Sequence, residues 1–85
     1  MMTSEYEVKL NPQVLKFLKK QDAHIYSRLR EGLQKLKDPL SCVEHFEGND
    51  YKYRIGDYRA LLDIDFGRKI VFVRVLDTRG RIYKR

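Results

Sequence analysis

The chain has 85 residues, of which 42% are hydrophobic and 35% are charged, a balance that suits one small folded domain with a modest core. It has no run of the roughly 18 apolar residues that a membrane span needs, and its start, MMTSEYEVKL, lacks the pattern of a signal peptide, so we expect a cytoplasmic protein. Cys42 is the only cysteine, which excludes an internal disulfide and a cysteine-based zinc site.

The first half of the chain predicts a strand and a helical hairpin. Residues 5–10, EYEVKL, alternate charged and apolar side chains, which is the period of a half-buried strand. Asn11 precedes a proline and is a typical helix cap, so a short helix is expected to end near residue 20. A second helix is expected to begin after the cap Asp22 and to end where Pro39 interrupts the helical spacing of apolar residues.

The second half of the chain changes to the two-residue period of strands. Residues 51–55, 58–65 and 69–76 read as an antiparallel three-stranded meander. Counting the reversals of chain direction makes the first strand antiparallel to the second and fourth, so it can join either edge of the sheet without parallel pairing. The helices need an apolar face to cover. We therefore predict a single α+β domain over residues 1–85, with both helices on one face of a mainly antiparallel four-stranded sheet.

The net charge of +6 is concentrated in the last third of the chain. Residues 1–50 hold eight Lys/Arg and eight Asp/Glu, whereas residues 51–85 hold ten against four. A local excess of this kind is typical of proteins that bind a polyanion, meaning nucleic acid, an acidic protein segment or an anionic membrane surface. Surface charge that serves only solubility is the alternative interpretation.

Three of these cations surround one turn of the meander. A type II′ turn at Gly56-Asp57 would place Arg54 directly opposite Arg59, with Lys52 two residues along on the same face, away from the helices. Like charges in this relation destabilise a sheet by roughly 0.2 to 1 kcal/mol. The cluster therefore suggests an anionic ligand. The alternatives are that the long side chains extend into solvent, or that a nearby carboxylate neutralises them: the candidates are Asp57, Asp63 and Glu47.

The residue types in this cluster suit the cleavage of RNA without a metal. RNA carries its own nucleophile, the 2′-OH, so cleavage needs alignment, a proton acceptor, a proton donor and cations beside the phosphate. Arginine stays protonated and suits a phosphate clamp rather than a base, so Lys52 is the better candidate for the proton acceptor. Tyr83 is the candidate donor. His24 and His45 read as solvent-facing or packing residues, and neither a metal ligand set nor a cofactor site is predicted.

The C-terminal segment adds a second basic stretch. Residues 78–85, TRGRIYKR, interleave cations with an aromatic ring, a composition that can neutralise phosphates and stack a base. If this segment follows the last strand past the open face of the sheet, both basic clusters can reach the same ligand. The residues predicted to bind RNA outside the catalytic set are Arg74, Arg81, Lys84 and Arg85.

The stretch FEGNDYKYRIGDYRALLDID, followed by IVFVRVL and RGRIY, resembles the RelE/ParE superfamily of toxins from prokaryotic toxin-antitoxin modules. In that family a glycine-containing loop precedes a Y-x-x-R-x-G-D-Y-R hairpin, and the likeness spans nearly the whole chain. It implies a small cytosolic toxin held inactive by a RelB-like antitoxin that wraps around it. The RelE branch cuts mRNA in the ribosomal A site without a metal or cofactor. The resemblance thus implies the ribosome and mRNA as partners, operator DNA only through the antitoxin complex, and no membrane.

The resemblance also implies a set of site residues. In RelE-like members a basic pair, a further arginine and an Arg-x-x-x-Tyr near the C-terminus carry the cleavage, and the matching residues here are Lys52, Arg54, Arg59, Arg79 and Tyr83. Several members have a histidine where this chain has Thr78, which favours a Lys/Arg/Tyr arrangement. We therefore expect a ribosome-dependent endoribonuclease, an mRNA interferase. The alternatives are a non-enzymatic ParE-like toxin that inhibits DNA gyrase, and a binding module whose basic face serves only an acidic antitoxin or operator DNA.

Overall fold

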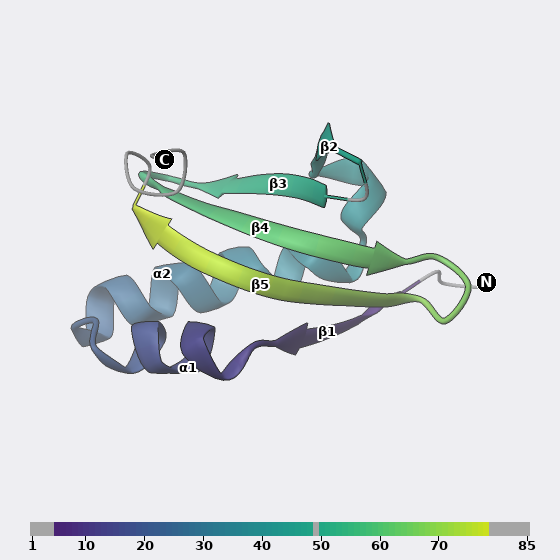
Figure 1. The fold of residues 1–85 in the computed structure, drawn as a ribbon. Helices are drawn as coiled ribbons and strands as arrows, with labels where there is room; N and C mark the ends of the chain where they lie inside the picture. Colours follow the sequence, from purple (N-terminus) through teal and green to yellow (C-terminus); the bar gives the residue numbers. More distant parts are fainter. Residues whose placement is uncertain (1–4, 49, 79–85) are drawn as a thin grey trace.

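The computed structural model describes residues 5–48 and 50–78, which form a two-layer α+β domain and so confirm the predicted fold class. In chain order the elements are β1 (Glu7–Leu10), α1 (Pro12–Lys19), α2 (Ala23–Gln34), β2 (Glu44–Glu47), β3 (Asp50–Ile55), β4 (Tyr58–Asp65) and β5 (Ile70–Thr78). Both helices lie on one side of a five-stranded sheet (Figure 1). Neither helix is long and apolar enough to cross a membrane.

The two predicted helix caps are confirmed. The side chain of Asn11 accepts a hydrogen bond from the backbone N–H of Gln13 at 2.8 Å, and that of Asp22 accepts one from the N–H of Ile25 at 3.0 Å. The second helix ends earlier than its apolar spacing predicts. After Gln34 the chain tightens into two short 3₁₀ turns, Lys35–Lys37 and Pro39–Ser41, because Pro39 cannot continue an α-helix.

The sheet contains one strand more than the sequence predicts. β2 pairs antiparallel with β3, and the strand order is β1-β5-β4-β3-β2. This extra strand adds one reversal of direction before the meander, so β1 pairs parallel with β5, with residues 7–10 facing residues 70–73. The prediction of a four-stranded sheet with an antiparallel first strand was therefore wrong. The four residues EHFE of β2 are too few and too polar to show a strand period.

The predicted register of the β3–β4 hairpin is confirmed. Arg54 lies opposite Arg59, and Lys52 lies opposite Leu61. Gly56 has a φ of +59°, whereas Asp57 is not in the positive-φ region, as a type II′ turn requires. The local turn chemistry is sufficient to set this register, since no long-range contact is needed to align two strands that are joined by two residues.

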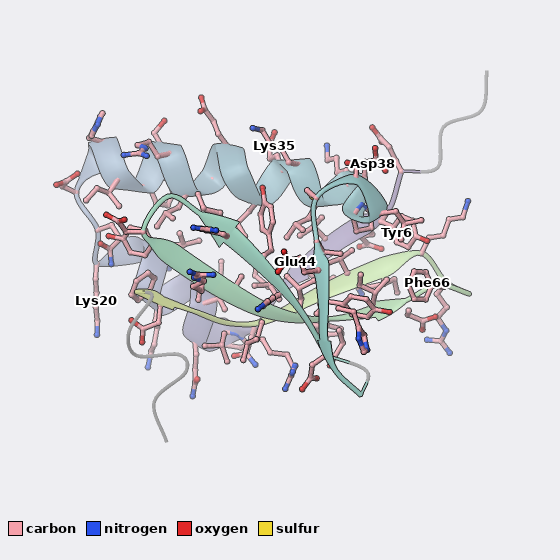
Figure 2. The ribbon with its side chains drawn as sticks, turned by 90° about the horizontal axis from the view of Figure 1, so that it is seen from above. Tyr6, Lys20, Lys35, Asp38, Glu44 and Phe66 are labelled. Atoms are coloured by element: carbon pink, nitrogen blue, oxygen red, sulfur yellow. The ribbon has the colours of Figure 1, made fainter. Side chains whose placement is uncertain are left out.

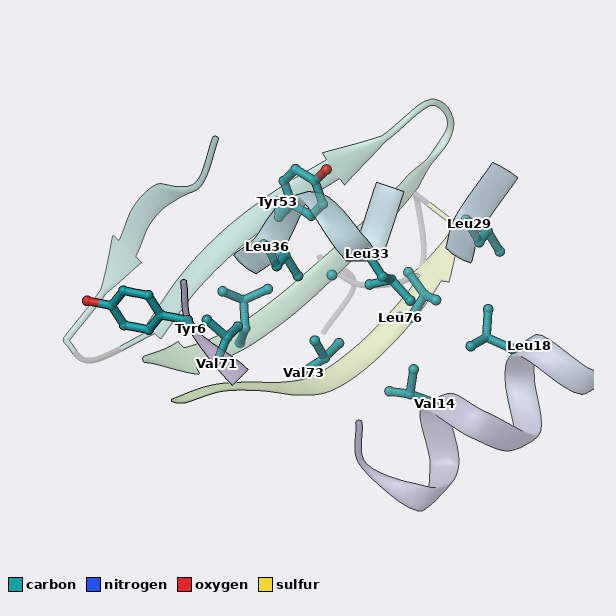
Figure 3. Packing of buried hydrophobic residues seen from close by; sticks show 12 residues of the cluster. Tyr6, Val14, Leu18, Leu29, Leu33, Leu36, Tyr53, Val71, Val73 and Leu76 are labelled. Carbon is teal, nitrogen blue, oxygen red and sulfur yellow. The ribbon is translucent and has the colours of Figure 1, made fainter. Parts of the chain in front are cut away.

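One face of the sheet is buried beneath the helices (Figure 3). Gly32 of α2 packs tightly against β3: a Cβ added there would lie 2.8 Å from Cγ2 of Ile55, and the Tyr53 hydroxyl donates to the Gly32 carbonyl oxygen at 2.7 Å. These contacts fix α2 over β3 and leave the opposite face of the hairpin uncovered by helices. The buried apolar residues are Tyr6, Val14, Leu18, Leu29, Leu33, Leu36, Tyr53, Ala60, Leu62, Val71, Val73 and Leu76.

Candidate functional site

The predicted cation cluster lines a pocket of about 200 Å³, which we call the cation pocket. Lys52 and Arg54 reach it from β3 and Arg59 reaches it from β4, because the alternation of the strands turns all three away from the buried Tyr53 and Ala60. Lys52 and Arg59 are half-buried, and Arg54 is exposed. The remaining residues that line the pocket are Cys42, Glu44 and Tyr53. The hairpin therefore gathers three of the five predicted catalytic residues around one small pocket.

Glu44 is a member of this pocket that the sequence analysis missed. It lies opposite Lys52 in the β2–β3 pairing, and its Oε1 is 3.7 Å from the Lys52 Nζ. Figure 2 shows Glu44 in the middle of the molecule when the sheet is viewed from above. A signal for this pairing does exist in the sequence, since Gly48 lies in a short polar stretch that suits a hairpin loop. It becomes informative only once the residues before it are recognised as a strand.

Arg74, predicted to bind RNA, is held by two carboxylates. Its Nη2 is 2.6 Å from Oδ1 of Asp50, and its Nε is 3.2 Å from Oδ2 of Asp63. Asp50 and Asp63 are directly opposite each other in the sheet, and the β4–β5 register shifts beside Leu61, next to Arg74. The guanidinium thus separates two like charges, which is a structural task, and its role toward RNA stays a prediction.

The remaining predicted site residues lie outside the described residues: they are Arg79, Arg81, Tyr83, Lys84 and Arg85. Strand β5 ends at Thr78, which pairs with Tyr58 at the turn end of the β3–β4 hairpin. This is also the end of the sheet that carries Arg54 and Arg59. The roles predicted for the C-terminal residues therefore stay predictions.

The two histidines lie outside the pocket. His45 is exposed, its Nε2 is 2.7 Å from the Gly48 carbonyl oxygen, and its ring packs edge-on against Tyr51 with the ring centroids 5.3 Å apart. His24 is exposed on α2. In residues 5–48 and 50–78, no group of three or more His, Cys, Asp or Glu side chains is placed to hold a metal ion.

Two weak acids at the edge of the pocket titrate above their ordinary range. Burial, helped by the negative charge of Asp38, raises the pKa of the Cys42 thiol. Burial, helped by Cys42, also raises the pKa of the Tyr53 hydroxyl. Both groups are therefore neutral near pH 7, and neither supplies a thiolate or phenolate to the pocket.

These shifts predict that the fold weakens at alkaline pH. In the unfolded chain the Cys42 thiol loses its proton at about pH 8.5, whereas in the folded protein it keeps the proton to higher pH. Between these two pKa values the unfolded state therefore binds fewer protons than the folded state. The free energy of unfolding should therefore fall as pH rises from about 8.5, with a further fall above about pH 10 from Tyr53. Urea denaturation between pH 7 and 10.5 measures this slope. Cys42→Ala should reduce the fall in unfolding free energy at the lower end of this pH range. An unchanged slope in that variant would show that the Cys42 thiol is not its cause.

Comparisons with known proteins agree with the fold. The family model described as the ParE toxin of type II toxin-antitoxin systems, parDE, matches residues 8–82. In the archaeal RelE-RelB complex of Pyrococcus horikoshii, one chain is 28% identical, with a TM-score of 0.75 over 91% of this chain and 98% of that one. One chain of the toxin-antitoxin complex RelBE2 of Mycobacterium tuberculosis is 23% identical, with a TM-score of 0.78 over 89% of this chain and 93% of that one.

The isolated E. coli RelE toxin also has this fold. It is 18% identical, with a TM-score of 0.68 over 92% of this chain and 90% of that one. A sequence search of curated proteins finds no match.

Proposed function

The chain belongs to the family of ParE toxins of type II toxin-antitoxin systems, and we propose that it acts in the manner of RelE, as an endoribonuclease that cuts mRNA on the ribosome. The observation that carries this proposal is the pocket in which Lys52, Arg54 and Arg59 converge. Arg54 and Arg59 face each other across the hairpin, so a phosphate bound in the pocket could accept charge-assisted hydrogen bonds from both guanidinium groups.

The proposed reaction is attack by the 2′-OH on the adjacent phosphate. The bond from the 2′ oxygen to phosphorus forms, the bond from phosphorus to the 5′ oxygen of the next nucleotide breaks, and the products are a 2′,3′-cyclic phosphate and a 5′-OH. Arg54 and Arg59 would stabilise the charge that develops on the phosphate oxygens. Lys52, in its neutral amine form, would take the proton of the 2′-OH, and Tyr83 would supply the proton to the leaving oxygen, with Arg79 as a further clamp.

The same proposal includes the partners of a toxin. A RelB-like antitoxin would hold the protein inactive, which is supported by relatives that were solved as toxin-antitoxin complexes. The net charge of +6 suits an acidic partner of this kind. Ribosomes and mRNA would be the targets in the cytoplasm, and operator DNA would be contacted only through the antitoxin complex.

A second candidate function is inhibition of DNA gyrase without catalysis. The observation that favours it is the family model, which is that of the ParE toxins. Against it stands the cation pocket, since a protein that only blocks an enzyme has no need to bring Lys52, Arg54 and Arg59 together.

One pair of assays separates the two functions. Primer extension on mRNA bound to stalled, purified ribosomes should show new 5′ ends in the A-site codon after the toxin is added, and naked mRNA should be cut far more slowly. A supercoiling assay with purified gyrase should show no inhibition at the same toxin concentration. Intact ribosomal mRNA together with inhibited gyrase would reject the nuclease and establish the second function.

Removing the carboxylate beside Lys52 should strengthen RNA binding. Glu44→Gln removes a negative charge 3.7 Å from Nζ that competes with a phosphate, and Glu44 is 74% exposed, so the gain should stay within about fivefold. Fluorescence anisotropy with a fully 2′-O-methylated RNA, which cannot be cleaved, measures the affinity. Glu7→Gln, an exposed residue on the opposite edge strand, is the matched control. Weaker binding in Glu44→Gln would show that the carboxylate helps to hold the RNA.

A further inference from the structure

Besides the cation pocket, the protein has a groove of about 360 Å³ between α1 and β5. Because β1 pairs with β5 only as far as Val73, helix α1 takes the place of an edge strand beside the last residues of β5. In Figure 2, Lys20 at the end of α1 lies at the end of the molecule opposite Phe66. The groove is lined by Gln13, Val14, Lys16, Phe17, Lys20, Arg74, Val75, Leu76 and Asp77.

The charges that line this groove are mainly positive. Lys16 and Lys20 are exposed and one helical turn apart, so they project from the same side of α1. The helix contains no acidic residue that could pair with them. Arg74 is bound by Asp50 and Asp63 and contributes little free charge. Asp77, which sits opposite Arg59, is the one carboxylate among the lining residues.

The groove and the cation pocket are lined by residues that neighbour each other in the sheet. Arg59 lines the pocket and Asp77 lines the groove, and these two residues are direct neighbours in the β4–β5 pairing. Neighbouring strands are about 4.8 Å apart, so the backbones of β3 and β5 lie only about 10 Å apart. Val75, which lines the groove, is 36% exposed and can contact a sugar or a base.

We propose that Lys16 and Lys20 form a second phosphate-binding subsite, which holds the RNA backbone a few nucleotides away from the phosphate in the cation pocket. This inference rests on the proposed nuclease function and extends it to the flanking nucleotides. The lysines neutralise phosphates without reading bases, and the apolar residues Phe17 and Val75 supply the contact surface between them. The subsite therefore adds affinity for longer RNA without adding sequence preference.

The test compares two lengths of 2′-O-methylated RNA, a trinucleotide and a hexanucleotide, by competition in fluorescence anisotropy. Wild-type protein should bind the hexanucleotide more tightly. Lys16→Glu with Lys20→Glu should weaken hexanucleotide binding on the order of tenfold and lower the slope of log affinity against log salt by about 1.4, the value for two phosphates of a single strand. Trinucleotide binding should change less than about twofold, because the proposal places Lys16 and Lys20 a few nucleotides away from the cation pocket, beyond the ends of so short an RNA.

The matched control is Lys9→Glu with Lys19→Glu, which changes the net charge equally at two exposed lysines that do not line the groove. An equal loss in this control, or wild-type binding that does not increase with RNA length, would overturn the subsite while leaving the cation pocket intact. Failure of wild-type protein to bind either RNA would overturn the subsite, whereas the nuclease function is decided by the cleavage of ribosome-bound mRNA. If the Lys16/Lys20 variant keeps its RNA affinity but loses binding to a Glu-rich peptide, the groove serves a protein partner and the RNA subsite is wrong.

Discussion

Arg59→Ala is expected to slow the cleavage of ribosome-bound mRNA by about 100-fold or more. Arg59 is half-buried in the cation pocket and directly opposite Arg54, so it is the cation best placed to meet charge that develops on a bound phosphate. Removal of one such preorganised donor from an active site typically costs 10²- to 10³-fold in rate, or about 3 to 4 kcal/mol. The single-turnover rate, followed by primer extension, measures the effect. The cleavage rate of Arg59→Lys should lie between the rates of wild type and Arg59→Ala, since lysine keeps the charge but not the bidentate geometry.

The stability of the same variant separates a catalytic role from a structural one. Arg59 faces Arg54 on one side and Asp77 on the other, so its removal relieves a like-charge pair but also loses an opposite charge, and the free energy of unfolding should change by less than about 1 kcal/mol. Arg68→Ala is the matched control, since Arg68 is exposed beyond the far end of β4 and 4.0 Å from Asp65. Cleavage at the wild-type rate by folded Arg59→Ala would remove the pocket from the mechanism.

Arg74→Ala is expected to cost about 1 to 2 kcal/mol of folding free energy. The arginine joins β5 to Asp50 of β3 and Asp63 of β4, and without it two carboxylates face each other across the sheet with no cation between them. All three side chains are 38% to 48% exposed, so the loss should lie between that of a surface pair and that of a buried one. Chemical denaturation at pH 7 measures it as a lower midpoint.

A rescue variant tests the mechanism of this loss. Arg74→Ala combined with Asp50→Asn and Asp63→Asn removes the repulsion and should recover at least half of the lost stability. The rate of cleavage per folded molecule should change less than threefold in the single variant, in contrast to Arg59→Ala. Unchanged stability together with weaker RNA binding would instead assign Arg74 the RNA contact that the sequence predicts.

Short-range chemistry explains which parts of this protein could be predicted without a structure. Asn11 and Asp22 cap their helices through backbone groups two or three residues away, and Gly56-Asp57 aligns β3 with β4 through a single turn. Alternation along those two strands then places Arg54 and Arg59 together. Each of these outcomes depends on neighbours along the chain, so the α+β class and the centre of the cation pocket followed from the order of residues.

The rest depended on which strands lie at the edges of the sheet. The polar strand β2 forms because β3 offers it an open edge, and it brings Glu44 to Lys52. Its presence also reverses the chain once more, which makes β1 parallel to β5 and lets α1 cover the end of β5 with Lys16 and Lys20 beside the groove. The ion pairs of Arg74 reach Asp63 and Asp50, which lie 11 and 24 positions away along the chain. Sequence alone determined the β3–β4 hairpin and its cations. The carboxylates beside Lys52 and Arg74, and the groove beside α1, were decided by the tertiary structure. The reason is that contacts between distant segments depend on which strand edges and which charges the rest of the sheet leaves without a neighbour.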